Sequence, residues 1–277
     1  MSIEQQYYEN DGFWSDEFFH SQSERFRTVA EHIPLDSRSL LDVGCGNGAF
    51  VHQLMGMPSR FDIIHATDRS LAALKRVKAE KTAASIDHLP FPDRSFDIAT
   101  SLEVIEHLPT MIYRAGLAQI CRVSRRYVLI SVPNEEDMEG HLIRCPSCNS
   151  RFNPDYHMRR YDARVMASLL VDWGFHSRET FFMGPKKHYV GVSEFVEWRR
   201  QRRSGGNPFH VSIQCPMCGE VLPASGKAIR TRPEGDVPHA EAQSSQGLKG
   251  LLKGLLHTRT DYGWVATLYE RLDLSGS

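Results

Sequence analysis

The sequence predicts an α/β protein built on a doubly wound, mostly parallel sheet. An apolar run of β-type residues, 40–43, ends in glycines at the alternate positions 44, 46 and 48, and an apolar pattern of helical spacing follows. Further apolar runs and helical patterns then alternate along the chain. Asp68 closes the second such run, where doubly wound nucleotide folds place an acidic residue beside the ribose of the ligand.

The individual elements follow in chain order. Residues 7–33 are expected to be helical, with an aromatic cluster followed by apolar residues at helical spacing, and Arg25 and Arg27 on this segment are expected to be solvated. Ser70 offers an N-cap for the helix after the second strand. The strands are expected at 39–43, 61–67, 81–86, 96–101 and 127–132, and the helices between them at 49–56, 70–79 and 110–123.

The second half of the chain is interrupted by a long insertion. A helix is expected over 162–173, where Gly174 provides a C-cap, and strands are expected at 176–183 and 263–269. About 80 residues separate these two strands, far more than a hairpin loop needs. Within this stretch a helix is expected over 190–203, and its end, Arg199–Arg203, is expected to be a solvated basic face, with contact to an anionic substrate or RNA as the alternative. A second helix is expected over 247–256, whose leucines share one face. That face is expected to dock on the protein, with a membrane surface as the alternative.

Composition excludes several classes of protein. The 277 residues carry a formal net charge of −1, so no overall field attracts nucleic acid or a membrane. No apolar run has the length of a membrane span, and the polar start of the chain is unlike a signal peptide. These features predict a cytoplasmic chain with one large domain and a small accessory unit.

Two sequence motifs carry a family resemblance. The stretch LDVGCGNG at 41–48 resembles the first motif of class I S-adenosylmethionine-dependent methyltransferases, and LPFPDRSFD at 89–97 resembles the segment that enters their fourth strand. The resemblance implies a Rossmann-like sheet of seven strands, the last two antiparallel, with S-adenosylmethionine as cofactor. It implies three regions: an N-terminal helical lid at 1–36, a cofactor-binding domain at 37–184 and 260–277, and the insertion at 185–259.

The resemblance also assigns the cofactor-binding residues. The glycines would contact the methionine and ribose portions of the cofactor. Asp42 would orient the glycine turn, and Asp68 would bind the ribose hydroxyls. The last two residues of the third strand would flank the adenine, and one residue after the fourth strand would lie against the methionine portion. In chain order these residues are Asp42, Gly44, Gly46, Gly48, Asp68, Ser85, Ile86 and Leu102.

The stretch Glu103-Val-Ile-Glu106-His107 is the first catalytic candidate. On a helical turn, positions i, i+3 and i+4 share a face, so the three polar side chains would converge. The pattern resembles the E-x-x-E-H of ubiquinone-pathway O-methyltransferases, where it can hold a divalent ion such as Mg²⁺. Three alternatives stay open: a metal site, His107 as a metal-free general base, and a structural role. His157 is a second candidate on the acceptor side.

Four cysteines form two C-x-x-C pairs, Cys145 with Cys148 and Cys215 with Cys218. Each pair places two sulfurs on one side of a tight turn, and four thiolates make the closed tetrahedral set of a structural zinc site. Both pairs lie in connections that leave the carboxyl edge of the sheet, so zinc would hold the insertion over the acceptor side. The alternatives are reduced, unpaired thiols or a redox pair.

These observations favour an S-adenosylmethionine-dependent methyltransferase. O-methylation of a small-molecule acceptor, a sugar or a secondary metabolite, is the first hypothesis. The second is an RNA methyltransferase that uses the zinc unit and Arg199–Arg203 to hold nucleic acid. The third is a non-catalytic zinc-binding interaction module on a methyltransferase fold.

Overall fold

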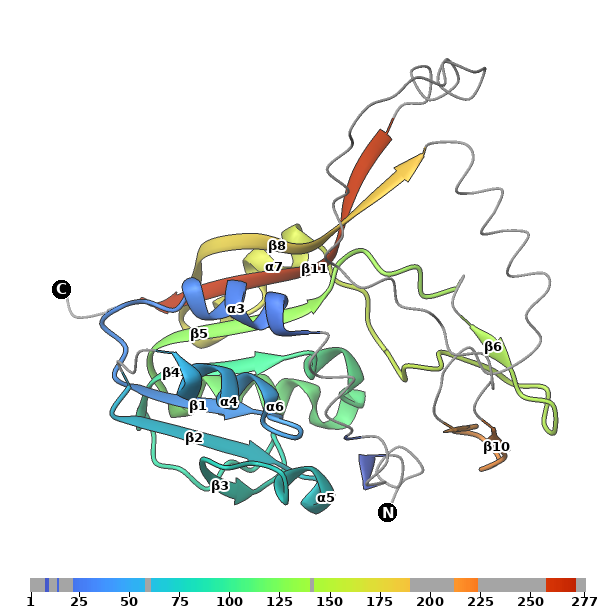
Figure 1. Cartoon of the computed structure of the whole chain (residues 1–277), viewed down its shortest axis with the longest axis horizontal. Helices are drawn as coiled ribbons and strands as arrows, with labels where there is room; N and C mark the ends of the chain where they lie inside the picture. Colours follow the sequence, from blue (N-terminus) through green and yellow to red (C-terminus); the bar gives the residue numbers. More distant parts are fainter. Residues whose placement is uncertain are drawn as a thin grey trace, which may run out of the picture.

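A computed structural model describes residues 8–9, 14, 22–57, 61–139, 142–189, 212–223 and 258–272 (Figure 1). The helices expected over 190–203 and 247–256 lie outside these ranges. Among the helices of the described ranges, none combines the length and the apolar character that crossing a bilayer requires.

Seven strands form one sheet in the order β3-β2-β1-β4-β5-β11-β8. The first five pair in parallel, and β11 is antiparallel to both of its neighbours, β5 and β8. The predicted doubly wound sheet and its antiparallel last pair are therefore confirmed. The strands are β1 (Ser39–Val43), β2 (Ile63–Asp68), β3 (Glu80–Ala83), β4 (Phe96–Leu102), β5 (Ser124–Pro133), β8 (Phe175–Tyr189) and β11 (Thr258–Arg271).

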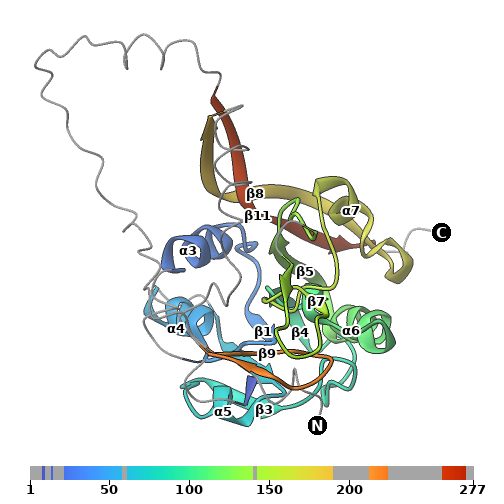
Figure 2. The ribbon, with the colours of Figure 1, turned by 90° about the vertical axis from the view of Figure 1, so that its right-hand side faces the viewer.

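Helices cover both faces of this sheet. Helices α3 (Ser23–Glu31) and α4 (Ala49–Gly56) lie on one face, and α6 (Thr110–Val123) and α7 (Ala163–Ser168) lie on the other (Figure 2). The alternation of side chains along β1 explains the two layers of core. Leu40 belongs to the buried cluster that includes residues of α3 and α4, whereas Leu41 belongs to the cluster that includes residues of α6 and α7.

Two expected helices are shorter than their apolar patterns suggested. Ser70 caps α5 (Leu71–Leu74) as predicted, since its hydroxyl accepts from the Ala73 N–H, but the helix ends after one turn. Tight turn bonds follow it and place Val77 in the core. The helix expected over 162–173 divides into α7 and the 3₁₀ helix η2 (Val171–Trp173), and Gly174 caps it with a φ of +77°.

Strands β8 and β11 are longer than predicted. They pair from Phe175 opposite Arg271 as far as Tyr189 opposite Thr258. The far part of this ribbon projects beyond the rest of the sheet (Figure 1). Of the helix expected over 7–33, the described part is helical over α3, whereas residues 9 and 14 lie in turns.

Candidate functional site

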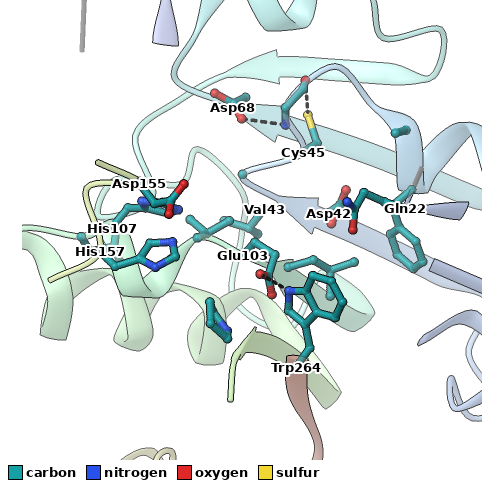
Figure 3. A pocket seen from close by; sticks show the side chains of 18 of the residues that line it. Gln22, Asp42, Val43, Cys45, Asp68, Glu103, His107, Asp155, His157 and Trp264 are labelled. Carbon is teal, nitrogen blue, oxygen red and sulfur yellow. Dashed lines mark hydrogen bonds between the residues drawn. The ribbon is translucent and has the colours of Figure 1, made fainter. Parts of the chain in front are cut away.

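A cavity of about 750 Å³ lies at the carboxyl ends of the central parallel strands. His107 and His157 lie at one side of the cavity, and Asp42 lies at the other (Figure 3). Gly48 and Glu106 are not among the residues that line it. The four cysteines do not line it, whereas the other expected cofactor-binding and catalytic residues do: Asp42, Gly44, Gly46, Asp68, Ser85, Ile86, Leu102, Glu103, His107 and His157.

The turn between β1 and α4 has a backbone that requires glycine. Gly44, Gly46 and Gly48 have φ values of +75°, +53° and +80°. A Cβ on Gly44 would lie 2.4 Å from a methyl carbon of Val104, and one on Gly46 would lie 2.6 Å from the Trp14 ring. The turn therefore brings bare backbone to the cavity wall, as a ligand that sits against peptide groups needs.

Gly46→Ala is expected to weaken binding of S-adenosylhomocysteine, the demethylated form of the cofactor that the sequence resemblance implies, by at least about tenfold. The added Cβ meets the indole of Trp14, and the positive φ is unfavourable for alanine by about 1 kcal/mol or more. Titration calorimetry measures the affinity. Gly56→Ala is the control, because that helical glycine has open space around its Cα. Equal affinity for both variants would contradict the prediction.

Two carboxylates flank the glycine turn. The Thr100 hydroxyl donates to Asp42 over 2.7 Å, and burial raises the pKa of Asp42 to about 7. Asp68 accepts from the N–H groups of Gly46 and Ser70, each over 2.8 Å. Burial raises the pKa of Asp68 too. Asp68 thus fixes the turn and leaves further lone pairs on its oxygens for hydroxyl groups of a ligand.

On the expected adenine side, the Ser85 hydroxyl donates to the carboxylate of Asp87. Ile86 is buried and lies over Gly116 of α6. Leu102, the last residue of β4, also lines the cavity. These side chains leave an apolar slot beside a polar hydroxyl.

The three polar residues of the E-x-x-E-H pattern do not share one helical face, so that prediction is wrong. A 3₁₀ helix, η1 (Ile105–His107), contains two of them, and Glu103 precedes it with a φ of +58°. The Glu103 carboxylate accepts from the Trp264 indole N–H over 2.7 Å and pairs with Arg25 over 3.2 Å (Figure 3). Contacts from α3 and β11 thus turn this carboxylate away from the other two side chains.

Glu106 lies behind the cavity wall rather than in it. Its side chain is 0% exposed, and its oxygens accept no hydrogen bond within the described part of the chain. Burial, with the nearby Glu103 charge, raises the pKa of Glu106 well above its usual range.

Glu106 forms a donor cluster with His107 and His157, whose ligand atoms lie within 4.8 Å of one another. One carboxylate and two imidazoles do not fit Mg²⁺, which prefers an octahedral set of oxygens. We therefore assign no chemical step to Mg²⁺.

The two histidines have different electrostatic environments. Burial lowers the pKa of His107 to about 3, so this ring is neutral, and its Nδ1 lies 3.3 Å from the Tyr8 hydroxyl. Burial also disfavours charge on His157, but the hydrogen bond and charge of Glu136 outweigh it and raise the pKa of His157. The ring centroids lie 4.6 Å apart. Among the described residues, His157 has a hydrogen bond to a carboxylate, that of Glu136, whereas Nε2 of His107 lies 3.9 Å from a carboxylate oxygen of Glu106.

Arg25 was expected to be solvated, but its side chain is 11% exposed and lines the cavity. Its guanidinium lies 4.9 Å from the centre of the Trp264 ring. Its Nε and Nη1 make no hydrogen bond within the described residues, although Nη1 forms the ion pair with Glu103. A buried arginine with unused N–H groups is suited to a carboxylate ligand.

The four predicted cysteines lie together at the tips of two short hairpins. The sulfurs of Cys145 and Cys218 are 3.6 Å apart, as are those of Cys148 and Cys215. The hairpins lie in front of the carboxyl ends of the parallel strands (Figure 2). One hairpin contains β6 (Ile143–Arg144) and β7 (Arg151–Phe152), and the other contains β9 (Ile213–Gln214) and β10 (Val221–Leu222).

The two hairpins have the same turn. The N–H of the residue after each second cysteine donates to the carbonyl of the first, Asn149 to Cys145 and Gly219 to Cys215. Asn149 and Gly219 have φ values of +64° and +77°. Four sulfurs that are close but not bonded in pairs could hold one metal ion, and they match the four-thiolate set of structural zinc sites.

Comparisons with known proteins agree with this geometry. The profile of a family described as "Methyltransferase domain" matches residues 17–180. A protein of Mycolicibacterium smegmatis, named as a probable S-adenosylmethionine-dependent methyltransferase, is 27% identical over 76% of this chain and 79% of its own length. A ubiquinone biosynthesis O-methyltransferase of Paramagnetospirillum magneticum is 34% identical, over 27% of this chain and 32% of that enzyme.

Solved structures share the fold. The chain superposes on a SAM-dependent methyltransferase from Archaeoglobus fulgidus with a TM-score of 0.53 and 12% sequence identity. The match covers 93% of this chain and all of that one.

Proposed function

Because this chain belongs to the methyltransferase domain family, we propose that it transfers a methyl group from S-adenosylmethionine to a hydroxyl of a small molecule, a sugar or a secondary metabolite. One observation carries the proposal. A single cavity has the glycine turn and Asp68 at one end and a histidine oriented by a carboxylate, His157 with Glu136, at the other. The first end suits a nucleoside, and the second suits removal of a proton.

The cofactor end is built to bind a nucleoside joined to an amino acid. Asp68 presents acceptor oxygens for the ribose hydroxyls, and Ser85 and Ile86 offer the adenine a hydroxyl and an apolar surface. Arg25 would pair with the carboxylate of the methionine portion. When bound, S-adenosylmethionine supplies a methyl group already activated on a sulfonium, so this chain has to align and deprotonate the acceptor.

At the acceptor end, we assign the general base to His157. Glu136 accepts from Nδ1 of the ring, which leaves Nε2 as the atom that takes the proton of the acceptor hydroxyl. The carboxylate then stabilises the imidazolium that forms. His107 lies beside this ring and stays neutral, so it adds no opposing charge.

The charge of the acceptor end favours a small neutral molecule over RNA. Acidic residues predominate in this part of the lining, and a polyanion would be repelled by them. Its acidic members are Glu103, Glu135, Glu136, Asp137, Asp155 and Asp261. The basic segment Arg199–Arg203 lies outside the described residues. The cavity with an intact glycine turn argues against the non-catalytic alternative.

We assign a structural zinc ion to the four cysteines. Four thiolates leave no open position for substrate, so the ion would hold the two hairpins together and take no part in the reaction. The two turns have the same geometry, which supports one ion bound by both.

The test is titration of the purified chain with S-adenosylhomocysteine. We expect binding by the wild type and a loss of at least about 100-fold in Asp68→Ala, because this change removes the ribose acceptor and the bond to the Gly46 N–H. Asp62→Ala is the control, since Asp62 pairs with the exposed Arg38 away from the cavity. No binding by a folded wild type would refute the proposal. Binding would be followed by a screen of sugars and secondary metabolites for methyl acceptors.

A further inference from the structure

Tyr156 connects the second cysteine hairpin to the acceptor end of the cavity. Tyr156 is 5% exposed and precedes His157 directly. Its hydroxyl donates to the carbonyl of Gln214 over 2.8 Å and accepts from the N–H of the same residue over 3.0 Å. Gln214 ends β9 and precedes Cys215. One contact, made by two parallel hydrogen bonds, and two peptide bonds thus connect Cys215 with His157, the proposed base.

The first hairpin reaches the same place through its own chain. Asn153 follows β7 directly, and its side-chain amide donates to the Glu136 carboxylate over 3.0 Å. Its side-chain oxygen accepts from the Asp155 N–H, and its carbonyl accepts from the Tyr156 N–H. Asn153 therefore holds the carboxylate that orients His157, and it also holds the turn that carries Tyr156.

The backbone at Tyr156 would not keep this conformation without its contacts. Its φ is +60°, which a bulky side chain rarely adopts and which costs of the order of 1 kcal/mol or more. The ring lies against Phe152 of β7, with the centroids 6.5 Å apart, and the hydroxyl is fixed by β9. Both hairpins therefore hold this residue in place.

We propose that Tyr156 is a positioning residue, which transmits the arrangement of the metal-bound cysteine hairpins to the His157–Glu136 pair. This inference rests on the proposed function for the roles of zinc and of His157. Zinc fixes β9 relative to β7, and Tyr156 converts that fixed position into the orientation of the next side chain. Loss of the metal would then disturb the acceptor end and leave the cofactor end intact.

The experiment measures the titration of His157 itself, so the methyl-acceptor substrate need not be known. The full chain is labelled with ¹⁵N-histidine, the His157 signal is identified by its loss in His157→Gln, and its pKa is measured by NMR with zinc bound and after zinc is removed by a chelator. In the wild type, zinc removal should lower this pKa by about one pH unit, because the pairing with Glu136 loosens.

Tyr156→Phe keeps the ring and removes both bonds to Gln214. With zinc bound, it should already show most of the lowering of the His157 pKa, and zinc removal should then lower the pKa by less than half as much as in the wild type, since both changes release the bonds to Gln214. Tyr161→Phe is the matched control. Tyr161 lies in the same segment and is 2% exposed, but its hydroxyl donates to Tyr113, so this variant should respond to zinc as the wild type does.

A wild type whose His157 titration is the same with and without zinc would overturn the inference, and this result needs no variant to fold. A full zinc response in Tyr156→Phe would also overturn it. Affinity for S-adenosylhomocysteine, measured on the same samples, should stay within about twofold of the wild type throughout. If no sample binds S-adenosylhomocysteine, the proposed function is refuted instead of this inference.

Discussion

Replacing His157 with glutamine is expected to lower kcat by about 10²- to 10⁴-fold, the usual contribution of a positioned general base. The glutamine side chain can accept a hydrogen bond but cannot take a proton at neutral pH. Affinity for S-adenosylhomocysteine should be unchanged, because the residue lies at the other end of the cavity. Methyl transfer to the acceptor found by the metabolite screen measures the effect.

His176→Gln is the control for this substitution. His176 is exposed on β8 and does not line the cavity, so its replacement should leave kcat unchanged. An unaltered kcat in His157→Gln would show that His157 is not the general base. A loss of kcat in His107→Gln alone would assign that role to His107.

The pairing of His157 with Glu136 determines how methyl transfer should depend on pH. The base form of His157 is neutral, and the negative charges of Glu136, Asp155 and Glu103 favour the protonated form. The neutral His107 ring does not oppose them at neutral pH. Activity should therefore fall as the pH falls through the raised pKa of His157 and reach a plateau above it. Glu136→Gln should move the midpoint to lower pH and reduce the plateau.

Substituting Cys145 by serine is expected to remove the bound zinc, from about one ion per chain to less than about 0.1. A structural zinc site depends on all four thiolates, and their binding free energy is what folds small zinc units. The small apolar core around Cys145 and Cys215 should then open, with rapid amide exchange in the hairpins and little change in the seven-stranded sheet. Elemental analysis and hydrogen exchange measure the two effects.

Ser147→Ala changes an exposed residue of the same turn and should keep the full zinc content. Wild-type protein purified without zinc, yet with protected hairpins, would show that the four cysteines need no ion.

The sequence predicted those parts of the site that local backbone chemistry determines. The turn from β1 into α4 needs glycine wherever it occurs, and Asp68 ends a strand that any doubly wound sheet would place beside that turn. The cysteine pairs were recognisable for the same reason, since each is a short turn with its own bonding.

Glu103 was misjudged because its partners are remote in the sequence. Trp264 is 161 residues away, and Arg25 belongs to the first described helix. A helical repeat predicts which residues share a face only if the segment is helical, and Glu103 has a left-handed backbone instead. The partnership of His157 with Glu136 likewise depends on a turn that Asn153 organises, and no local pattern indicates it.

The position of β11 between β5 and β8 also has a consequence for synthesis on the ribosome. β8 is made first, yet in the described sheet it pairs with β11 alone, and 68 residues lie between Tyr189 at the end of β8 and Thr258 at the start of β11. At about 5–20 residues per second, the nascent chain carries an unpaired β8 and an open β5 edge for roughly 3 to 14 s. Such edges invite pairing with other chains. Truncation before β11 should therefore yield aggregates rather than a smaller soluble domain, and a chaperone that shields exposed strands should raise the yield of the full chain.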